Sequence, residues 1–190
     1  GFFSNGWVEF GSNNEYSGDF CIYGNDGVDM ANSNDFGSNV MVGTSSDSDI
    51  DGMNNNDIDD DAMFTASLDL DLIDLVDDVI SDMQDGKLDG IGDFDTYTVR
   101  NIGSFDKHDT LIPYSFYIIE DEADFSKQTV VENVAVVAGK EIEFGSNVTI
   151  DNVVFAAEKK ITFGSNVEFS DLGYCSDGRY SNYLFSEDNI

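Results

Sequence analysis

Basic residues are scarce in this chain of 190 residues, which has 8 Lys plus Arg against 39 Asp plus Glu and a formal net charge of −31. A field of this sign repels nucleic acid and anionic lipid, and it attracts cations and basic partners. It also makes the compact state repel itself, so screening salt or bound divalent ions should favour folding. We therefore expect no nucleic-acid partner, and the acidity fits a marine or otherwise halophilic source.

Long apolar runs are missing too. No stretch approaches the roughly 18 apolar residues that span a membrane, and no signal peptide opens the chain. The first residue is Gly1 rather than Met, so we expect a fragment whose membrane anchor, if it has one, lies upstream. A hydrophobic content of 41% and an aromatic content of 13% exclude a disordered acidic tail.

Catalytic motifs are the third absence. The single histidine, His108, lies in a polar segment that is typical of a solvated turn. We find no G-x-S-x-G sequence, no Cys/His zinc spacing and no phosphate-binding loop. A β-helical polysaccharide lyase would need cations on one face, and the chain has two arginines, Arg100 and Arg179, with no motif around either. We predict that the chain is not an enzyme.

The two cysteines, Cys21 and Cys175, lie far apart in the chain. In a secreted protein this pattern predicts one disulfide that joins the two ends, and two free core thiols are the alternative.

A repeat is the most informative feature that is present. The string Phe-Gly-Ser-Asn begins at Phe10, Phe36, Phe144 and Phe163. The last two copies belong to longer units, 134–152 and 153–171, whose apolar residues match at a displacement of 19. Self-similarity at a fixed period is typical of a solenoid, in which each repeat covers the apolar face of its neighbour.

Alternation within each unit indicates strand, turn and strand. Ile142 and Phe144 alternate with glutamates, and Val148 and Ile150 flank Thr149. Gly and Asn between them tolerate the left-handed backbone angles of a sharp corner. Antiparallel hairpins with a shared turn are the alternative, and the constant spacing favours stacked parallel rungs.

The chain end resembles the start of another unit. Residues 183–190 match 154–161 at a displacement of 29, with the extra residues around 173–182. On this alignment the next Phe-Gly-Ser-Asn is expected just after Ile190, which predicts at least one more rung.

The organisation along the chain predicts a mainly β fold: a parallel β-solenoid (β-helix-like) with one amphipathic α-helix packed alongside. We expect a single solenoid domain fragment over 1–190, with a loop-plus-helix insertion at about 44–95. Leu and Val residues recur at helical spacing over Ser67–Gln84, with Thr65 or Ser67 as the cap and Gly86 as the stop. A packing face is favoured over a partner-binding helix. Strands are expected at Trp7–Phe10, Phe20–Tyr23, Val28–Met30, Val40–Val42, Thr96–Ile102 and Leu111–Glu120, with regular rungs from Gln128.

An acidic loop gives the one candidate metal site. The segment from Asp47 to Gly52 matches the opening of a calcium loop, D-x-D-x-D-G. The twelfth position is Ile58 rather than Glu, and no helix precedes the loop, so it is not a complete EF-hand. Chance matches are common in so acidic a chain. The candidate calcium ligands are Asp47, Asp49, Asp51, Asp57 and Asp59.

Two segments carry a resemblance to a known family. Residues 20–42, FCIYGNDGVDMANSNDFGSNVMV, resemble the Cys-x-x-Gly-x-x-Gly-Val-x-x-x-Asn-x-Asn segment of TadE/TadG-like proteins of tight-adherence (Flp) pilus systems. The run from Asn152 to Asp171, with the segment that follows it, is similar to their rung-forming C-terminal region. The resemblance covers about half of the chain. It implies an envelope-anchored protein with a periplasmic or extracellular domain that acts in pilus assembly or attachment, in which Cys21 is the family's cysteine and no residue is catalytic.

The leading hypothesis is therefore a non-enzymatic structural or adhesive component of the bacterial envelope, at the cell surface, with protein partners or a homo-oligomer. A stand-alone surface solenoid that binds glycan, ice or mineral is the second hypothesis. Ice binding needs regular outward Thr rows, and Thr149 and Thr162 do not occupy equivalent places in the repeat. A carbohydrate-active β-helix enzyme is the third. Apart from the candidate calcium, no cofactor is expected.

Overall fold

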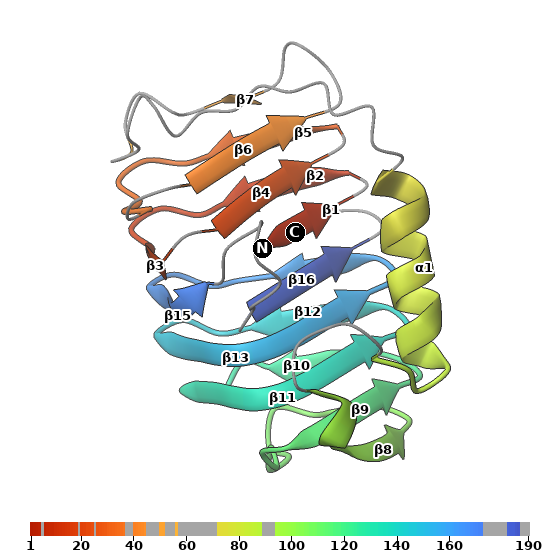
Figure 1. Cartoon of the computed structure of the whole chain (residues 1–190). Coiled ribbons are helices and arrows are strands. Elements are labelled where there is room, and N and C mark those ends of the chain that lie inside the picture. The colour runs from red at the N-terminus through yellow and green to blue at the C-terminus, as the bar shows by residue number, and fades with distance from the viewer. Residues whose placement is uncertain are drawn as a thin grey trace.

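The computed structural model of the chain is mainly β, with parallel strands wound into a β-solenoid and one α-helix alongside (Figure 1). The fold class predicted from the repeat is confirmed. The structure describes residues 1–4, 6–18, 20–24, 26–36, 40–44, 50–51, 56, 72–88, 94–172 and 182–186.

The described strands form three sheets. A long sheet has the order β6-β4-β1-β16-β13-β11-β9-β8, with β15 beside β13 and β3 beside β15, and two short sheets have the orders β10-β12-β14 and β2-β5-β7. The strands are β1 (Phe2–Ser4), β2 (Trp7–Phe10), β3 (Glu15–Gly18), β4 (Phe20–Gly24), β5 (Gly27–Met30), β6 (Val40–Thr44), β7 (Ile50–Asp51), β8 (Thr98–Ile102), β9 (Ser115–Ile119), β10 (Ala123–Phe125), β11 (Val130–Ala138), β12 (Glu141–Phe144), β13 (Val148–Ala157), β14 (Lys160–Thr162), β15 (Val167–Leu172) and β16 (Asn182–Ser186).

The register of the strands follows the sequence repeat. Strand β11 pairs with β13 at a displacement of 19, as in Val134 with Val153, and β13 pairs with β16 at the predicted 29, as in Val154 with Tyr183. All pairings within the described part of the chain are parallel, so the antiparallel alternative is wrong. The N-terminal rungs are one residue longer, because Phe2 pairs with Ile22 and Ile22 with Val42.

The path of the chain was not predicted. Strand β1 lies in the middle of the long sheet, between β4 and β16. The N-terminal rungs wind from β1 to β6, and the later rungs start at β8 at the opposite end and wind back through β13 to β16 (Figure 1). The Leu184 N–H donates to the Gly1 carbonyl at 3.0 Å. The place beside β16, where the sequence predicts a further rung, is thus occupied by β1.

Helix α1 (Leu72–Gln84) lies along the long sheet and contacts β1, β16, β13 and β11. It joins the two series of rungs in sequence and crosses several of them in space (Figure 1). Ile80 and Met83 are buried in an apolar cluster with outward residues of the sheet such as Ala135 and Val154. The predicted packing face is therefore confirmed, while Thr65 and Ser67, the predicted caps, lie outside the described residues.

The predicted stop of the helix at Gly86 is confirmed. The Gly86 N–H donates to the Met83 carbonyl at 2.9 Å, and the Lys87 N–H donates to the Asp82 carbonyl at 2.8 Å. This pair of bonds is the Schellman motif, and it needs a left-handed residue, which Gly86 supplies at φ +80°. A short 3₁₀ turn, Phe94–Thr96, precedes β8, so the strand predicted from Thr96 begins at Thr98.

The core inside the rungs is built from stacked columns. The phenylalanines of the repeat lie over one another, with centroid distances of 4.8 Å from Phe105 to Phe125, 5.4 Å from Phe125 to Phe144 and 5.0 Å from Phe144 to Phe163. Large aromatic side chains bury the most apolar area per residue, so this column is a main source of the hydrophobic stabilisation.

At the corners of the rungs, the Asn and Gly of the repeat meet two different structural requirements. Asn147 and Asn166 take left-handed backbone angles, with φ 60° and 58°, as predicted. The neighbouring glycines are needed for a different reason, because a Cβ on Gly164 would lie 2.7 Å from the carbonyl carbon of Gly145 in the rung below. Stacked corners leave no room there for a side chain.

Candidate functional site

Exposed carboxylates line up in a row on the N-terminal rungs. Glu9 in β2 pairs with Asp29 in β5, and Asp29 pairs with Asp51 in β7. All three residues are exposed, and neighbouring strands of a sheet lie about 4.8 Å apart. The pleat therefore sets three like charges side by side on one face of the solenoid.

A second row lies on the adjoining face. Glu168 in β15 pairs with Glu15 in β3, and Glu15 forms a bridge with Asp35. The corner that separates the two rows contains Gly11 and Asn13 of the first Phe-Gly-Ser-Asn copy. We call Glu9, Asp29, Asp51, Glu168, Glu15 and Asp35 the carboxylate rows.

The later rungs balance some of their carboxylates with cations, although Asp124 pairs with Glu143 and Glu132 pairs with Asp151. Glu141 lies beside Lys160 across β12 and β14, and the Lys140 Nζ lies 2.5 Å from the Asp121 Oδ1. This hydrogen bond to Asp121 raises the pKa of Lys140. The outward surface of this part of the solenoid is therefore of mixed charge.

Against the effect of burial, nearby hydrogen-bond donors and cations lower the pKa of Asp124 in β10. Desolvation raises its pKa, but the hydrogen bond from the Ser126 N–H at 2.8 Å and the nearby Lys107 and His108 outweigh that effect, so the net pKa is lowered.

Most of the predicted site residues cannot be placed. Among the candidate calcium ligands, Asp51 lies in β7 within the carboxylate rows, whereas Asp47, Asp49, Asp57 and Asp59 lie outside the described residues. Cys21 is half-buried in β4, and Cys175 lies outside the described residues. The calcium site and the disulfide therefore stay predictions.

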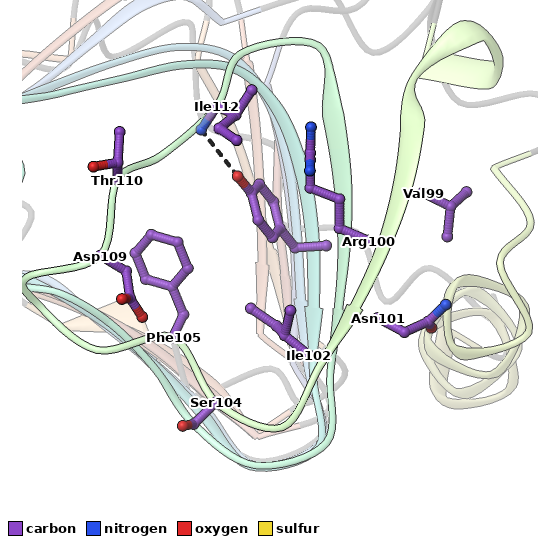
Figure 2. Close-up of a pocket in the computed structure, with 10 residues that line it drawn as sticks. Val99, Arg100, Asn101, Ile102, Ser104, Phe105, Asp109, Thr110 and Ile112 are labelled. Carbon is purple, nitrogen blue, oxygen red and sulfur yellow. Dashed lines mark hydrogen bonds between the residues drawn. The ribbon is translucent and has the colours of Figure 1, made fainter.

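The end of the solenoid at β8 contains an open cavity of about 520 Å³ (Figure 2). Its walls combine apolar residues of the last rung, such as Ile102, Phe105 and Ile112, with the aromatic ring of Tyr117. The Ile112 N–H donates to the Tyr117 Oη at 2.9 Å, which holds the ring in place in the cavity wall. The cavity is the exposed end of the same core that runs through the rungs.

Arg100 occupies an unusual position in this cavity. It pairs with Tyr117, Tyr117 with Val136 and Val136 with Phe155, so Arg100 is the first member of an inward column that is otherwise apolar. Its Nε–H donates to the Ser115 Oγ at 2.8 Å, and Ser115 is buried. The sequence analysis named Arg100 but did not predict this position, because alternation of apolar and polar residues would turn Val99 inward, and only the two-residue spacing from Ile102 places Arg100 on the inward face.

Other residues considered in the sequence analysis lie where no site forms around them. His108 is exposed in a turn, as expected. Thr149 stands between Val130 and Glu168, and Thr162 stands beside Glu143 on another sheet. The two threonines therefore belong to different rows, which disfavours an ice-binding face.

The comparisons with known proteins identify a family without assigning an activity. A family model described as "Domain of unknown function (DUF7867)" matches residues 1–176. The chain belongs to this family. No curated protein and no solved structure matches the chain. No helix among the residues that the structure describes is long and apolar enough to cross a membrane.

Proposed function

We propose that the chain is a non-enzymatic structural or adhesive protein of the bacterial cell surface that binds a basic partner through its carboxylate rows. The observation that carries this proposal is the direct pairing of Glu9, Asp29 and Asp51 on adjacent rungs. Like charges placed side by side cost stability. A cationic partner relieves that cost, so the bound state gains more than an isolated carboxylate would give.

The charge distribution along the chain supports the same surface. Residues 1–86 contain no Lys or Arg, so any cation near the rows comes from the later rungs, as Lys160 does in the pocket that it lines with Glu9 and Asp29. A rigid solenoid holds the carboxylates in fixed positions, which lowers the entropy lost on binding a repetitive basic ligand.

The role in tight-adherence pili stays a prediction that rests on the resemblance of residues 20–42 and of the rungs from Asn152. The family match adds no function to it. A neighbouring gene for a prepilin peptidase or secretion ATPase would favour this role over a stand-alone surface solenoid.

Binding to poly-lysine at low ionic strength tests the proposal. We expect the triple variant Glu9→Gln, Asp29→Asn, Asp51→Asn to bind at least fivefold more weakly than the unaltered chain, by titration calorimetry. The matched control, Asp78→Asn, Glu120→Gln, Glu141→Gln, removes the same charge from exposed sites outside the rows, and none of the three pairs with a carboxylate across the described strands. It should change affinity less than twofold.

Equal weakening in the two triple variants would mean that the net charge of −31, and not the rows, attracts the partner. That result would overturn the proposal.

A further inference from the structure

Among the described strands, β8 pairs with β9 alone, so the other edge of its backbone has no strand partner there. The Thr98 N–H donates to the Tyr114 carbonyl, and the Ile102 carbonyl accepts from the Glu120 N–H, so Thr98 and Ile102 face β9. In a parallel strand alternate residues face the same neighbour, so the backbone groups of Val99 and Asn101 face away from β9. Val99 is 47% exposed, which agrees with an uncovered edge.

Arg100 adds a charge to this edge. Within the described part of the chain, Lys87 and Lys140 form ion pairs and Arg100 forms none. One of the five N–H donors of its guanidinium is used by Ser115, and the other donors are left for a ligand. A half-buried guanidinium without a carboxylate is notable in a chain with 39 Asp plus Glu.

The cavity beside Arg100 lies where the next rung of the solenoid would stack, so it can accept the inward side chains of one more strand. An added strand would set one side chain over Arg100 and the next inward side chain over Ile102, above Phe105 and Tyr117. A carboxylate suits the first position and an apolar group suits the second. Backbone groups of the same strand would bond to Val99 and Asn101, which is the strand-addition mode of peptide recognition.

We propose that the β8 end docks an extended strand of another protein, in parallel with β8, with an acidic residue on Arg100 and an apolar residue two positions later on Ile102. A second copy of this chain is disfavoured, because two copies each carry a net charge of −31. The partner is therefore neutral or basic as a whole and acidic at one residue of the docking strand. This surface is distinct from the carboxylate rows.

A short peptide tests the docking mode on the full chain. The probe is acetylated, amidated and reads lysine, valine, threonine, glutamate, threonine, valine, lysine. Titration should show saturable binding, and hydrogen exchange should show new protection at the Val99 and Asn101 amides. No binding up to millimolar peptide, or binding without this protection, would overturn the proposal.

A double-mutant cycle tests the charge contact. The Arg100→Gln variant should bind the probe about tenfold more weakly, the usual effect of losing a charged hydrogen bond. A probe with glutamine in place of glutamate should lose the same factor on the unaltered chain and nothing more on Arg100→Gln. Lys140→Gln, which removes a cation from the side of the solenoid, should leave affinity within twofold. Independent losses in the cycle would contradict the contact.

Asn101→Pro tests the backbone edge. Proline is tolerated on an edge strand where its missing N–H faces solvent, so the variant should fold and fail to bind. Unaltered affinity in a folded Asn101→Pro variant would overturn strand addition. If sedimentation shows self-association that this substitution abolishes, the occupant is a second copy and the assignment to another protein is wrong.

Discussion

The rungs on either side of the β1–β16 junction differ in their content of basic residues. Residues 1–86 hold 20 of the 39 acidic residues and no Lys or Arg, whereas residues 87–190 hold 19 acidic residues and all 8 cations. The two parts of the chain therefore contain similar numbers of acidic residues, but all the cations belong to the later part, with Lys160 lining a pocket beside Glu9 and Asp29 of the N-terminal rungs. The difference shows that one scaffold can present an acidic surface at one end and a mixed one at the other.

The interiors differ as well. In the later rungs one inward column contains Val148 and Val167, both buried. On the N-terminal side the same column continues with Asn14 and Asn34, because the Val167 N–H donates to the Asn14 Oδ1 and the Asn14 N–H donates to the Asn34 Oδ1. The N-terminal rungs thus replace apolar packing at this position with a ladder of amide hydrogen bonds, which holds only if every member is satisfied.

The largest expected effect is in the apolar column. Phe144→Ala removes a side chain that is 2% exposed and lies between Phe125 and Phe163. We expect the free energy of unfolding in urea to fall by about 3–5 kcal/mol because a cavity remains. Phe163→Ala, at a partly exposed position of the same column, should cost less. Equal losses at the two sites would contradict the role of burial.

A smaller loss is expected from the amide ladder. Asn34→Val supplies the residue type of the later rungs, but it leaves the Asn14 N–H and the Ala31 carbonyl without their side-chain partner. Each unsatisfied buried group costs about 1–3 kcal/mol. Urea unfolding should show a loss of this size, while Asn32→Val, at an exposed position in the same turn, should stay near zero. An unchanged free energy of unfolding in Asn34→Val would mean that the N-terminal rungs accept valine at this position as well as the later rungs do.

The smallest effects should come from surface charge, with opposite signs in the two parts. Asp29→Asn relieves repulsion from Glu9 and Asp51, whereas Glu141→Gln removes attraction to Lys160. At low salt the first should stabilise and the second destabilise by about 0.2–1 kcal/mol each. Both changes in stability should shrink in 1 M NaCl, where the Debye length is only about 3 Å and interactions between exposed charges are screened. The same sign in both variants would contradict the comparison.

Much of the fold could be predicted because solenoid contacts between successive rungs are local in sequence. The displacement of 19 between matching residues predicted the pairing of β11 with β13, and the displacement of 29 predicted the pairing of β13 with β16. The helical spacing and Gly86 predicted where α1 ends, because the Schellman motif needs a left-handed residue. The repeat also predicted the corners, although the close approach that requires Gly164 depends on the stacked neighbour.

The candidate sites were harder to predict, since each depends on residues far apart in the sequence. Arg100 becomes a candidate site because β8 belongs to the terminal rung of the stack, where the inward column has no further neighbour among the described strands. No short sequence motif marks the end of a stack. Glu168 and Glu15 become neighbours only when β15 pairs with β3.

The sequence by itself favoured parallel rungs, predicted the displacements of 19 and 29 between the later ones, and marked where the helix ends, because a repeat encodes the contact of each rung with the next. Only the tertiary structure decided that β1 lies beside β16, so that residues such as Phe2 and Leu184 share one column. That junction is made by packing and backbone pairing across almost the whole chain length, and a period between successive rungs carries no information about it.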